Sequence, residues 1–216
     1  MPLPAAAFFD MDGLLIDSEP TWFQAEVNLA ATWGFAMGPE HYPNMLGKPL
    51  AVSSAYIKDV CGGPLTRDEI ATGVELAMID RLRDGVPMLP GAKELLVELA
   101  AAGVPIALVS ASSRLIVDAS LTAIGAEHFR FTVSADDVEN GKPNPDPYLK
   151  AAALMGADPA DCLVLEDSPT GVAAAKAAGC RIIAVPHASP IEAGPRVTVV
   201  KSLTEVSVES IRALFA

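Results

Sequence analysis

The sequence predicts an α/β protein whose parallel sheet is covered by helices on both faces and carries an inserted, small all-helical domain. Three observations lead to this class. Short apolar runs typical of buried strands alternate with helical patterns, which favours parallel βαβ units. One long interval near the N-terminus, residues 17–84, contains helical patterns only. The length of 216 residues, 51% of them hydrophobic, suffices for a full core plus a small attached domain.

Four short apolar runs predict the buried strands of the sheet. The first spans Ala5 to Phe9, and it would deliver Asp10 to its C-terminal end. The other three runs are Pro105–Ser110, Cys162–Glu166 and Arg181–Val185.

The helices between and after these strands carry recognisable end signals. A helix over Lys93–Ala102 is followed by Gly103 as a C-cap, and another begins at Ser168 and ends at Gly179. The C-terminal segment Val206–Phe215 has the pattern of a packing helix without a functional motif.

The all-helical interval predicts a second domain. The core domain would comprise residues 1–16 and 85–216, and the inserted domain residues 17–84. Both crossings are polar or contain proline, as hinges often do. The clearest amphipathic helices of the inserted domain are Thr21–Trp33, Ala51–Val60 and Thr66–Arg81.

Composition excludes several partners. With 15 Lys and Arg against 27 Asp and Glu, the net charge is −12, which disfavours binding to nucleic acid or to an anionic membrane. No uncharged apolar run approaches the ~18 residues of a membrane helix, and the N-terminus lacks the basic segment of a secretory signal. The 3 cysteines have no Cys-x-x-Cys spacing. We therefore expect a cytoplasmic monomer with inert thiols.

Two carboxylates end the first predicted strand. Asp10 and Asp12 are two residues apart, so they project to the same face above the sheet edge. Close negative charges raise each other's pKa unless a cation neutralises them, and no Lys or Arg precedes Lys48. Oxygen ligands of this kind favour Mg²⁺. The alternative is a solvated acidic turn.

A second acidic pair strengthens the metal interpretation. Glu166 and Asp167 directly follow the run CLVL, in the same strand-end position as Asp10. Because the carboxyl ends of parallel strands form one functional edge, four carboxylates could meet there. Burying them for structure alone is unfavourable, so a metal site is preferred over a solvated edge.

Two further segments supply groups for binding an anion. Ser110, followed by Ala111, ends a predicted strand and is expected to begin a helix, which would offer a hydroxyl and backbone N–H groups to a phosphate. An ordinary helix N-cap is the alternative. Lys142, between Gly141 and Pro143, would be the one cation near the carboxylates; the alternative is a solvated lysine in a turn.

Together these segments resemble the haloacid dehalogenase superfamily, over about Ala5 to Val185. The resemblance implies a Rossmann-like parallel sheet with a helical cap domain after the first motif. Within the superfamily the chain is similar to the β-phosphoglucomutase-like branch, and most closely to hexose-phosphate phosphatases of the 2-deoxyglucose-6-phosphate kind. The four motifs read D-M-D-G-L-L-I-D-S at Asp10–Ser18, V-S-A-S at Val109–Ser112, G-K-P-N-P-D-P-Y at Gly141–Tyr148 and L-E-D-S at Leu165–Ser168.

The resemblance implies roles for the carboxylates. Asp10 would be the nucleophile that forms an aspartyl-phosphate, and Asp12 would protonate the leaving oxygen and then deprotonate water. Mg²⁺ would be held by the Asp10 carboxylate, the Asp12 carbonyl and Asp167, with Glu166 contributing directly or through water. Dehalogenases and phosphonate-cleaving relatives lack an aspartate at the position of Asp12, which therefore indicates phosphoryl transfer.

The resemblance also implies the phosphate-binding groups. Ser110, Ala111 and Lys142 would hold the transferring phosphoryl oxygens, and Lys142 would offset the charge on Asp10. Positioning and electrostatic stabilisation are what phosphoryl transfer mainly requires.

The function that we expect is hydrolysis of small phosphorylated sugars by a Mg²⁺-dependent phosphatase. A small helical cap can close over such a substrate and exclude water. In the cap, Trp22 and Lys48 are candidates for substrate contact, with packing in the cap core as the alternative for Trp22.

Two other functions remain open at this point. The first is a phosphosugar mutase of the β-phosphoglucomutase type, which would use the same aspartyl-phosphate. Such mutases carry a histidine ten residues after the second aspartate, where this chain has Trp22. The second is a binding protein without activity, although no carboxylate or lysine of the motifs is missing.

Overall fold

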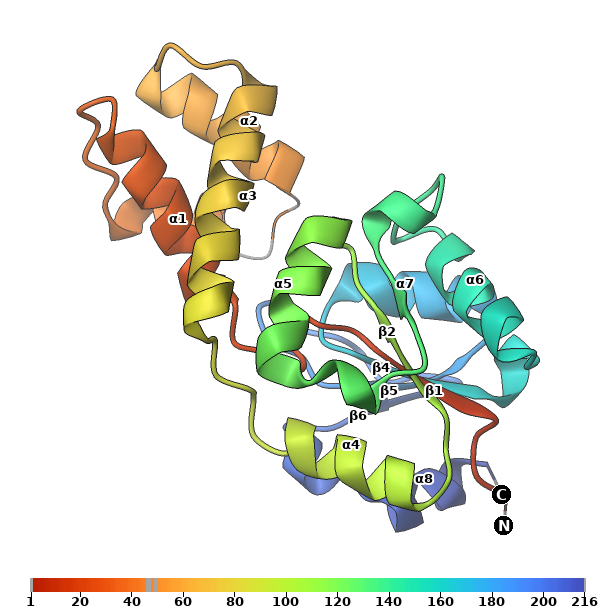
Figure 1. Cartoon of the computed structure of the whole chain (residues 1–216). Helices are drawn as coiled ribbons and strands as arrows, with labels where there is room; N and C mark the ends of the chain where they lie inside the picture. Colours follow the sequence, from red (N-terminus) through yellow and green to blue (C-terminus); the bar gives the residue numbers. More distant parts are fainter. Residues whose placement is uncertain (1, 46–47, 49, 216) are drawn as a thin grey trace.

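A computed structural model describes residues 2–45, 48 and 50–215, and this part of the chain contains a six-stranded, fully parallel sheet (Figure 1). The predicted α/β class is confirmed. The strand order is β3-β2-β1-β4-β5-β6, so the first strand lies in the middle. The strands are β1 (Ala6–Phe9), β2 (Ile106–Val109), β3 (Thr132–Val133), β4 (Cys162–Glu166), β5 (Arg181–Ala184) and β6 (Val197–Val199).

The four strands predicted from apolar runs are the four central ones. The two strands that the sequence did not indicate, β3 and β6, are the edges of the sheet. Each is short, and each has residues that are only partly buried, such as Thr132 and Val199, or exposed, such as Thr198. An edge strand of this kind carries no continuous apolar run, so the pattern that identifies buried strands is missing.

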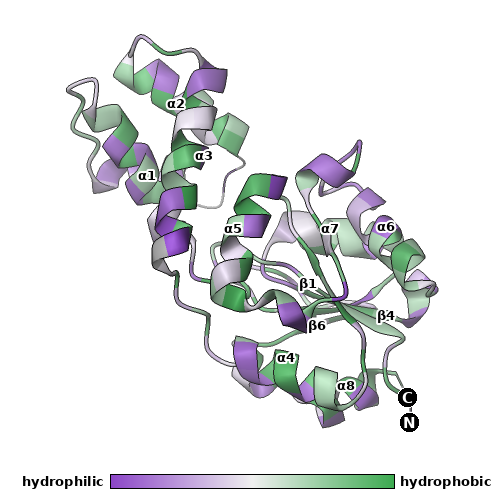
Figure 2. Cartoon of the chain, viewed as in Figure 1, coloured by the Kyte–Doolittle hydropathy of each residue, from purple (hydrophilic) through white to green (hydrophobic). Residues whose placement is uncertain are grey.

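Alternating residues of β1 divide the core into two layers. Ala7 and Phe9 pack on one face, and Ala6 and Phe8 pack on the other; all four are fully buried. The first face is covered by α4 (Ala92–Ala101), α5 (Arg114–Ile124) and α8 (Val208–Leu214). The second face is covered by α6 (Asp146–Met155) and α7 (Pro169–Ala178). Figure 2 shows the strands between these helices as mostly hydrophobic.

Most helix ends lie where the sequence placed them. The hydroxyl of Ser168 caps α7 by accepting from the Gly171 N–H at 3.0 Å, and Gly179 ends that helix with φ +86°. The expectation that Ser110 begins a helix is wrong. The N-cap of α5 is Ser113, whose hydroxyl accepts from the Ile116 N–H, because a short turn separates β2 from the helix.

The inserted segment forms its own layer of helices apart from the sheet (Figure 1). Its helices are α1 (Glu19–Ala31), η1 (Pro39–Asn44), α2 (Leu50–Cys61) and α3 (Arg67–Asp84). We call these the cap helices. They share an apolar cluster that includes Ala25, Ala30, Ile57, Ile70 and Val74. The domain boundaries at residues 1–16, 17–84 and 85–216 stay predictions.

The last turns of α3 connect the cap helices to the core. Met78, Ile79 and Leu82 pack into the apolar cluster on the α4 face of the sheet. At its other end α3 begins with a capping box, in which Thr66 and Glu69 exchange hydrogen bonds. Among the helices that the structure describes, none has the length and apolar character needed to cross a membrane.

Candidate active site

The topology gathers the predicted site residues at the carboxyl ends of three neighbouring strands. Asp10 follows β1, Ser110 follows β2, and Glu166 is the last residue of β4. Strand β1 pairs with β2 on one side and with β4 on the other. The chain first builds the sheet outward through β2 and β3 and then reverses through β4, so these residues surround the switch point where open α/β sheets bind ligands.

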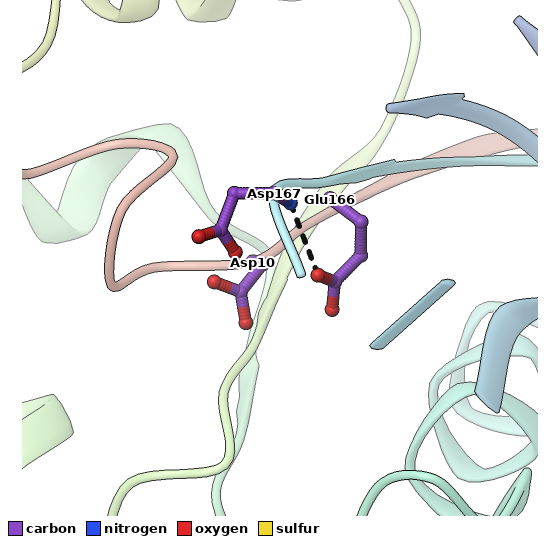
Figure 3. Close-up of side chains that lie close together, drawn as sticks. All are labelled: Asp10, Glu166 and Asp167. Carbon is purple, nitrogen blue, oxygen red and sulfur yellow. Dashed lines mark hydrogen bonds between the residues drawn. The ribbon is translucent and has the colours of Figure 1, made fainter. Parts of the chain in front are cut away.

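Three carboxylates meet at this edge (Figure 3). Oxygens of Asp10, Glu166 and Asp167 lie within 4.8 Å of one another, and the residues are 7%, 0% and 8% exposed. Burial raises the pKa of Asp10 to about 8 and the pKa of Asp167 to about 9. A cation among these oxygens would favour the ionised forms, so the donor set fits a hard divalent metal. Asp12 is not part of this group.

Lys142 joins two of these carboxylates. Its Nζ donates to Asp10 Oδ1 at 2.6 Å, to Glu166 Oε1 at 2.6 Å and to the Val109 carbonyl at 2.9 Å. The lysine side chain is 3% exposed. Although burial alone would lower it, the pKa of Lys142 is raised above its ordinary value by the negative charges of Asp10 and Glu166. All three ammonium protons have acceptors, so the geometry supports charge compensation of Asp10 directly.

Glu166 is held by the chain at both oxygens. Its Oε1 accepts from the Tyr148 hydroxyl at 2.7 Å, and its Oε2 accepts from the Asp167 N–H at 3.1 Å and from the Ser168 N–H at 3.2 Å. The Ser168 hydroxyl also donates to Oε2 at 3.1 Å. A Cβ on Gly171 would overlap this carboxylate, so only glycine fits there. These bonds favour a positioning role for Glu166 over direct metal coordination.

The Asp12 carboxylate is hydrogen-bonded by side chains of both the cap and the core. Its Oδ1 accepts from the Ser18 hydroxyl at 2.5 Å and from the Trp22 indole N–H at 3.4 Å, and its Oδ2 accepts from the Ser112 hydroxyl at 2.8 Å. The turn after Asp12 requires Gly13, which has φ +81° and no room for a Cβ. Two aspartates that are two residues apart are therefore held in different environments.

A cavity of about 670 Å³ extends from this edge to the cap helices. This volume is typical of small-molecule sites. Its core end contains Asp10, Asp12, Asp167, Ser110, Ala111 and Lys142, and its cap end contains Trp22, Glu26, Tyr42, Lys48 and Ser53. Glu166 is the one predicted site residue that does not line the cavity among the described residues.

The predicted phosphate-binding and cap residues differ in their surroundings. Ser110 is 2% exposed, and its hydroxyl accepts from the Ser112 N–H at 3.0 Å. Ala111 and Lys48 are exposed. Trp22 is partly buried and packs against the apolar clusters of both the core and the cap helices. Its packing and its place in the cavity wall are both observed, so the two alternatives for Trp22 are compatible.

Five residues of the site were missed by sequence reasoning. Ser18, Ser112 and Tyr148 lie inside the quoted motifs, and their hydroxyls are the signal that could have identified them. Glu26 and Ser53 lie outside every motif. The only signal for Glu26 is a carboxylate within a helical stretch that is otherwise apolar on its buried side.

Comparison with known proteins gives consistent matches. A family model described as haloacid dehalogenase-like hydrolase matches residues 7–185. Hexitol phosphatase B of Escherichia coli K12 is 36% identical over 214 residues, which cover 95% of this chain and 96% of that protein. Hexitol phosphatase A of the same strain is 37% identical over 178 residues, covering 82% and 81%. The crystal structure of CbbY from Rhodobacter sphaeroides with phosphate has a TM-score of 0.82 at 26% identity and covers 94% and 96% of the two chains.

Proposed function

This chain belongs to the haloacid dehalogenase-like hydrolase family, and we propose that it is a Mg²⁺-dependent phosphatase of small phosphorylated sugars that works through an aspartyl-phosphate. One observation carries the proposal: Asp10 is buried against Lys142 and lines the cavity between core and cap helices, while Asp12 lines the same cavity with hydrogen-bond partners of its own. The names of the two hexitol phosphatases support the substrate class.

The metal would be held by the side chains of Asp10 and Asp167 together with the main-chain carbonyl of Asp12. Mg²⁺ bound there would neutralise charge on the phosphoryl oxygens and on the carboxylates around it. Glu166 would act on this group through Lys142 and through the backbone N–H of Asp167, both of which it binds. Any contact of Glu166 with the metal would then pass through water.

Asp10 would act as the nucleophile. A carboxylate oxygen attacks phosphorus, and the bond from phosphorus to the sugar oxygen breaks as the new bond forms. The hydrogen bond from Lys142 fixes Asp10 Oδ1 and favours its ionised form. Ser110 and Ala111, at the end of β2, would bind the phosphoryl oxygens beside it.

Asp12 would move the protons. It gives a proton to the departing sugar oxygen, and in the second half of the reaction it takes a proton from the water that attacks the aspartyl-phosphate. The Ser18, Trp22 and Ser112 donors hold its carboxylate in one orientation. Because Trp22 belongs to α1, the position of the cap helices affects how the Asp12 carboxylate is held.

The test is phosphate release from sorbitol 6-phosphate, 2-deoxyglucose 6-phosphate and glucose 6-phosphate, with Mg²⁺ and after chelation. We expect release from at least one of them that depends on Mg²⁺. Asp10→Asn should lower the rate by about a thousandfold or more, because the nucleophile is lost. Undiminished release by this variant, or no release by the wild type from any of the three, would contradict the proposal.

The same experiment separates the two other candidate functions. With β-glucose 1-phosphate, a mutase would produce glucose 6-phosphate without free phosphate. At the position where such mutases carry histidine, the indole of Trp22 here donates to Asp12 and offers no acid or base. Calorimetric binding of a sugar phosphate without any turnover would instead identify a binding protein.

A further inference from the structure

The cap end of the cavity contains a buried carboxyl group that the proposed reaction does not use. Glu26 lies on α1, is 4% exposed and lines the same cavity as Asp10. Ser53 of α2, which is 2% exposed, lines the same cavity, and its hydroxyl donates to the Leu50 carbonyl at 3.2 Å. The cap helices therefore place two polar side chains in the wall of the cavity, at the end remote from Asp10.

The partners of Glu26 within the protein are few for a group so deeply buried. A carboxyl group has four acceptor positions when ionised, and leaving them unmatched in a buried place costs free energy. Among the described residues no cation forms an ion pair with Glu26, and the nearby Ser53 hydroxyl offsets only part of the effect of burial on its pKa. Burial raises the pKa of Glu26 to about 7, so near neutrality the group can accept or donate a hydrogen bond.

Apolar and aromatic side chains share the cap end of the cavity with this pair, beside the charged Glu19 and Lys48. The cavity wall near the cap includes Trp22, Phe23, Tyr42, Met45 and Leu50. A ligand group that enters there must satisfy the carboxyl group by hydrogen bonding, since an apolar group would leave it unpaired. Hydroxyl groups meet this requirement, because each can donate to a carboxylate oxygen of Glu26 or to the hydroxyl oxygen of Ser53.

We propose that Glu26, together with Ser53, binds hydroxyl groups of the substrate at the end remote from its phosphate, and so makes the enzyme selective for polyhydroxylated phosphate esters. This inference rests on the proposed phosphatase function and assigns its specificity. Sites built to hydrogen-bond a substrate hydroxyl reject analogues that lack it far more strongly than apolar pockets reject a size change.

A purely structural role for Glu26 makes a different prediction. Glu26 is a buried residue of α1 and Ser53 a buried residue of α2, so a substitution that disturbs their packing loosens the cap helices. Loosening would affect every substrate alike. A role in hydroxyl recognition changes the KM of a polyol phosphate while leaving an ester without hydroxyls unaffected.

The experiment compares sorbitol 6-phosphate with p-nitrophenyl phosphate in Glu26→Met, which keeps length and packing but removes the hydrogen bonds. We expect the KM for sorbitol 6-phosphate to rise by about tenfold or more, with both constants for p-nitrophenyl phosphate within about twofold of the wild type. Glu26→Gln should restore part of the affinity for sorbitol 6-phosphate, because an amide still bonds to hydroxyls.

A neighbouring pair of serines supplies the matched control. Ser53 lines the cavity, whereas the adjacent Ser54 is 1% exposed, its hydroxyl has no hydrogen-bond partner among the described residues, and it does not belong to the cavity lining. We expect Ser53→Ala to raise the KM for sorbitol 6-phosphate by about threefold and Ser54→Ala to leave it unchanged. This pair decides the question even if Glu26→Met fails to fold.

Two results would overturn the inference. An unchanged ratio of activity on the two substrates in Glu26→Met, or equal kinetics of Ser53→Ala and Ser54→Ala, would show that the pair does not recognise hydroxyls. If the wild type released phosphate from neither substrate, the proposed function itself would fail and this inference with it.

Discussion

The two ends of the cavity bury carboxylates in opposite ways. At the core end, Lys142 lies between Asp10 and Glu166 and donates to both at 2.6 Å. At the cap end, Glu26 is 4% exposed, and the group nearby that lowers its pKa is the neutral hydroxyl of Ser53. The raised pKa of Lys142 reflects the two negative charges beside it, and the raised pKa of Glu26 reflects burial.

This difference matches what each end must do. A reaction at phosphorus needs charges that are fixed before the substrate arrives, because preorganised groups need no rearrangement in the transition state. Recognition of a neutral polyol needs hydrogen-bonding capacity that the protein has not already used. At the core end the chain itself therefore holds Lys142 and Glu166 in place, whereas the hydrogen bonds of the cap end are left for a ligand to complete.

Removing the lysine should have the largest effect. Lys142→Met leaves Asp10 and Glu166 buried without their shared cation, so we expect kcat/KM to fall by about a thousandfold and stability by about 3–5 kcal/mol. Steady-state kinetics and urea unfolding measure the two quantities. Lys150→Met is the control, since this lysine of α6 donates to the carbonyl of Asp137, which precedes that helix, and does not belong to the cavity lining. A loss of activity as large as that of Lys142→Met would contradict the assignment.

Neutralising the glutamate that holds this lysine should have the next largest effect. Glu166→Gln keeps the shape but loses a charge, and we expect kcat to fall by about 10–100-fold and the Mg²⁺ concentration for half-maximal rate to rise. Tyr148→Phe removes only one hydrogen bond to Glu166, so its effect should be smaller. Equal kinetics of Glu166→Gln and the wild type at all Mg²⁺ concentrations would show that Glu166 does not position the group.

At the cap end, we expect an effect on stability that depends on pH. The folded state holds a proton on Glu26 up to about pH 7, whereas the unfolded chain loses it near 4.5, so the native state binds more protons in between. The contribution of Glu26 is then fully present below pH 4.5 and is lost as pH rises through 7. Relative to wild type, Glu26→Met should gain about 1–3 kcal/mol between pH 4.5 and 8.

Urea unfolding of both proteins at each pH measures this difference, and the matched comparison cancels the other titrating groups. A constant difference between the two proteins across this pH range would mean that Glu26 keeps its ordinary pKa in the folded state. The contrast between the two ends of the cavity would then be lost.

The smallest expected effect comes from the charge of the whole molecule. A protein of net charge −12 repels a phosphate dianion at long range, although Lys142 and a bound metal attract it locally. Because salt screens the long-range part more than the buried part, we expect added salt to lower the apparent KM for a sugar phosphate by about twofold. A clear rise in KM with salt would count against this view.

The core end could be predicted from the sequence because its residues follow strands. Asp10, Ser110 and Glu166 each come directly after an apolar run, and parallel strands bring such positions to one edge. The position of Lys142 could not be derived in this way, since its loop reaches the site from between η3 (Ala135–Asp137) and α6. The role of Lys142 beside Asp10 was implied only by the resemblance of its motif to the family.

At the cap end, Trp22 and Lys48 were predicted to contact substrate and both line the cavity, but Glu26 and Ser53 could not be predicted, for a physical reason. Glu26 and Ser53 lie on two helices whose packing is decided by an apolar cluster, and nothing in their spacing places them on the same cavity. The edge strands β3 and β6 were missed because short, half-exposed strands lack an apolar run. The predicted helix start at Ser110 was wrong because the hydroxyl that caps α5 belongs to Ser113.

The central claim is that Asp10 carries the phosphoryl group, and the most direct measurement is to trap it. Asp12→Asn lacks the base that would activate water, but p-nitrophenolate leaves without an acid, so this variant should accumulate the intermediate. We expect a burst of about one p-nitrophenolate per enzyme and one added phosphoryl group on the peptide containing Asp10. Turnover without a burst, or a phosphoryl group on any other residue, would contradict the account.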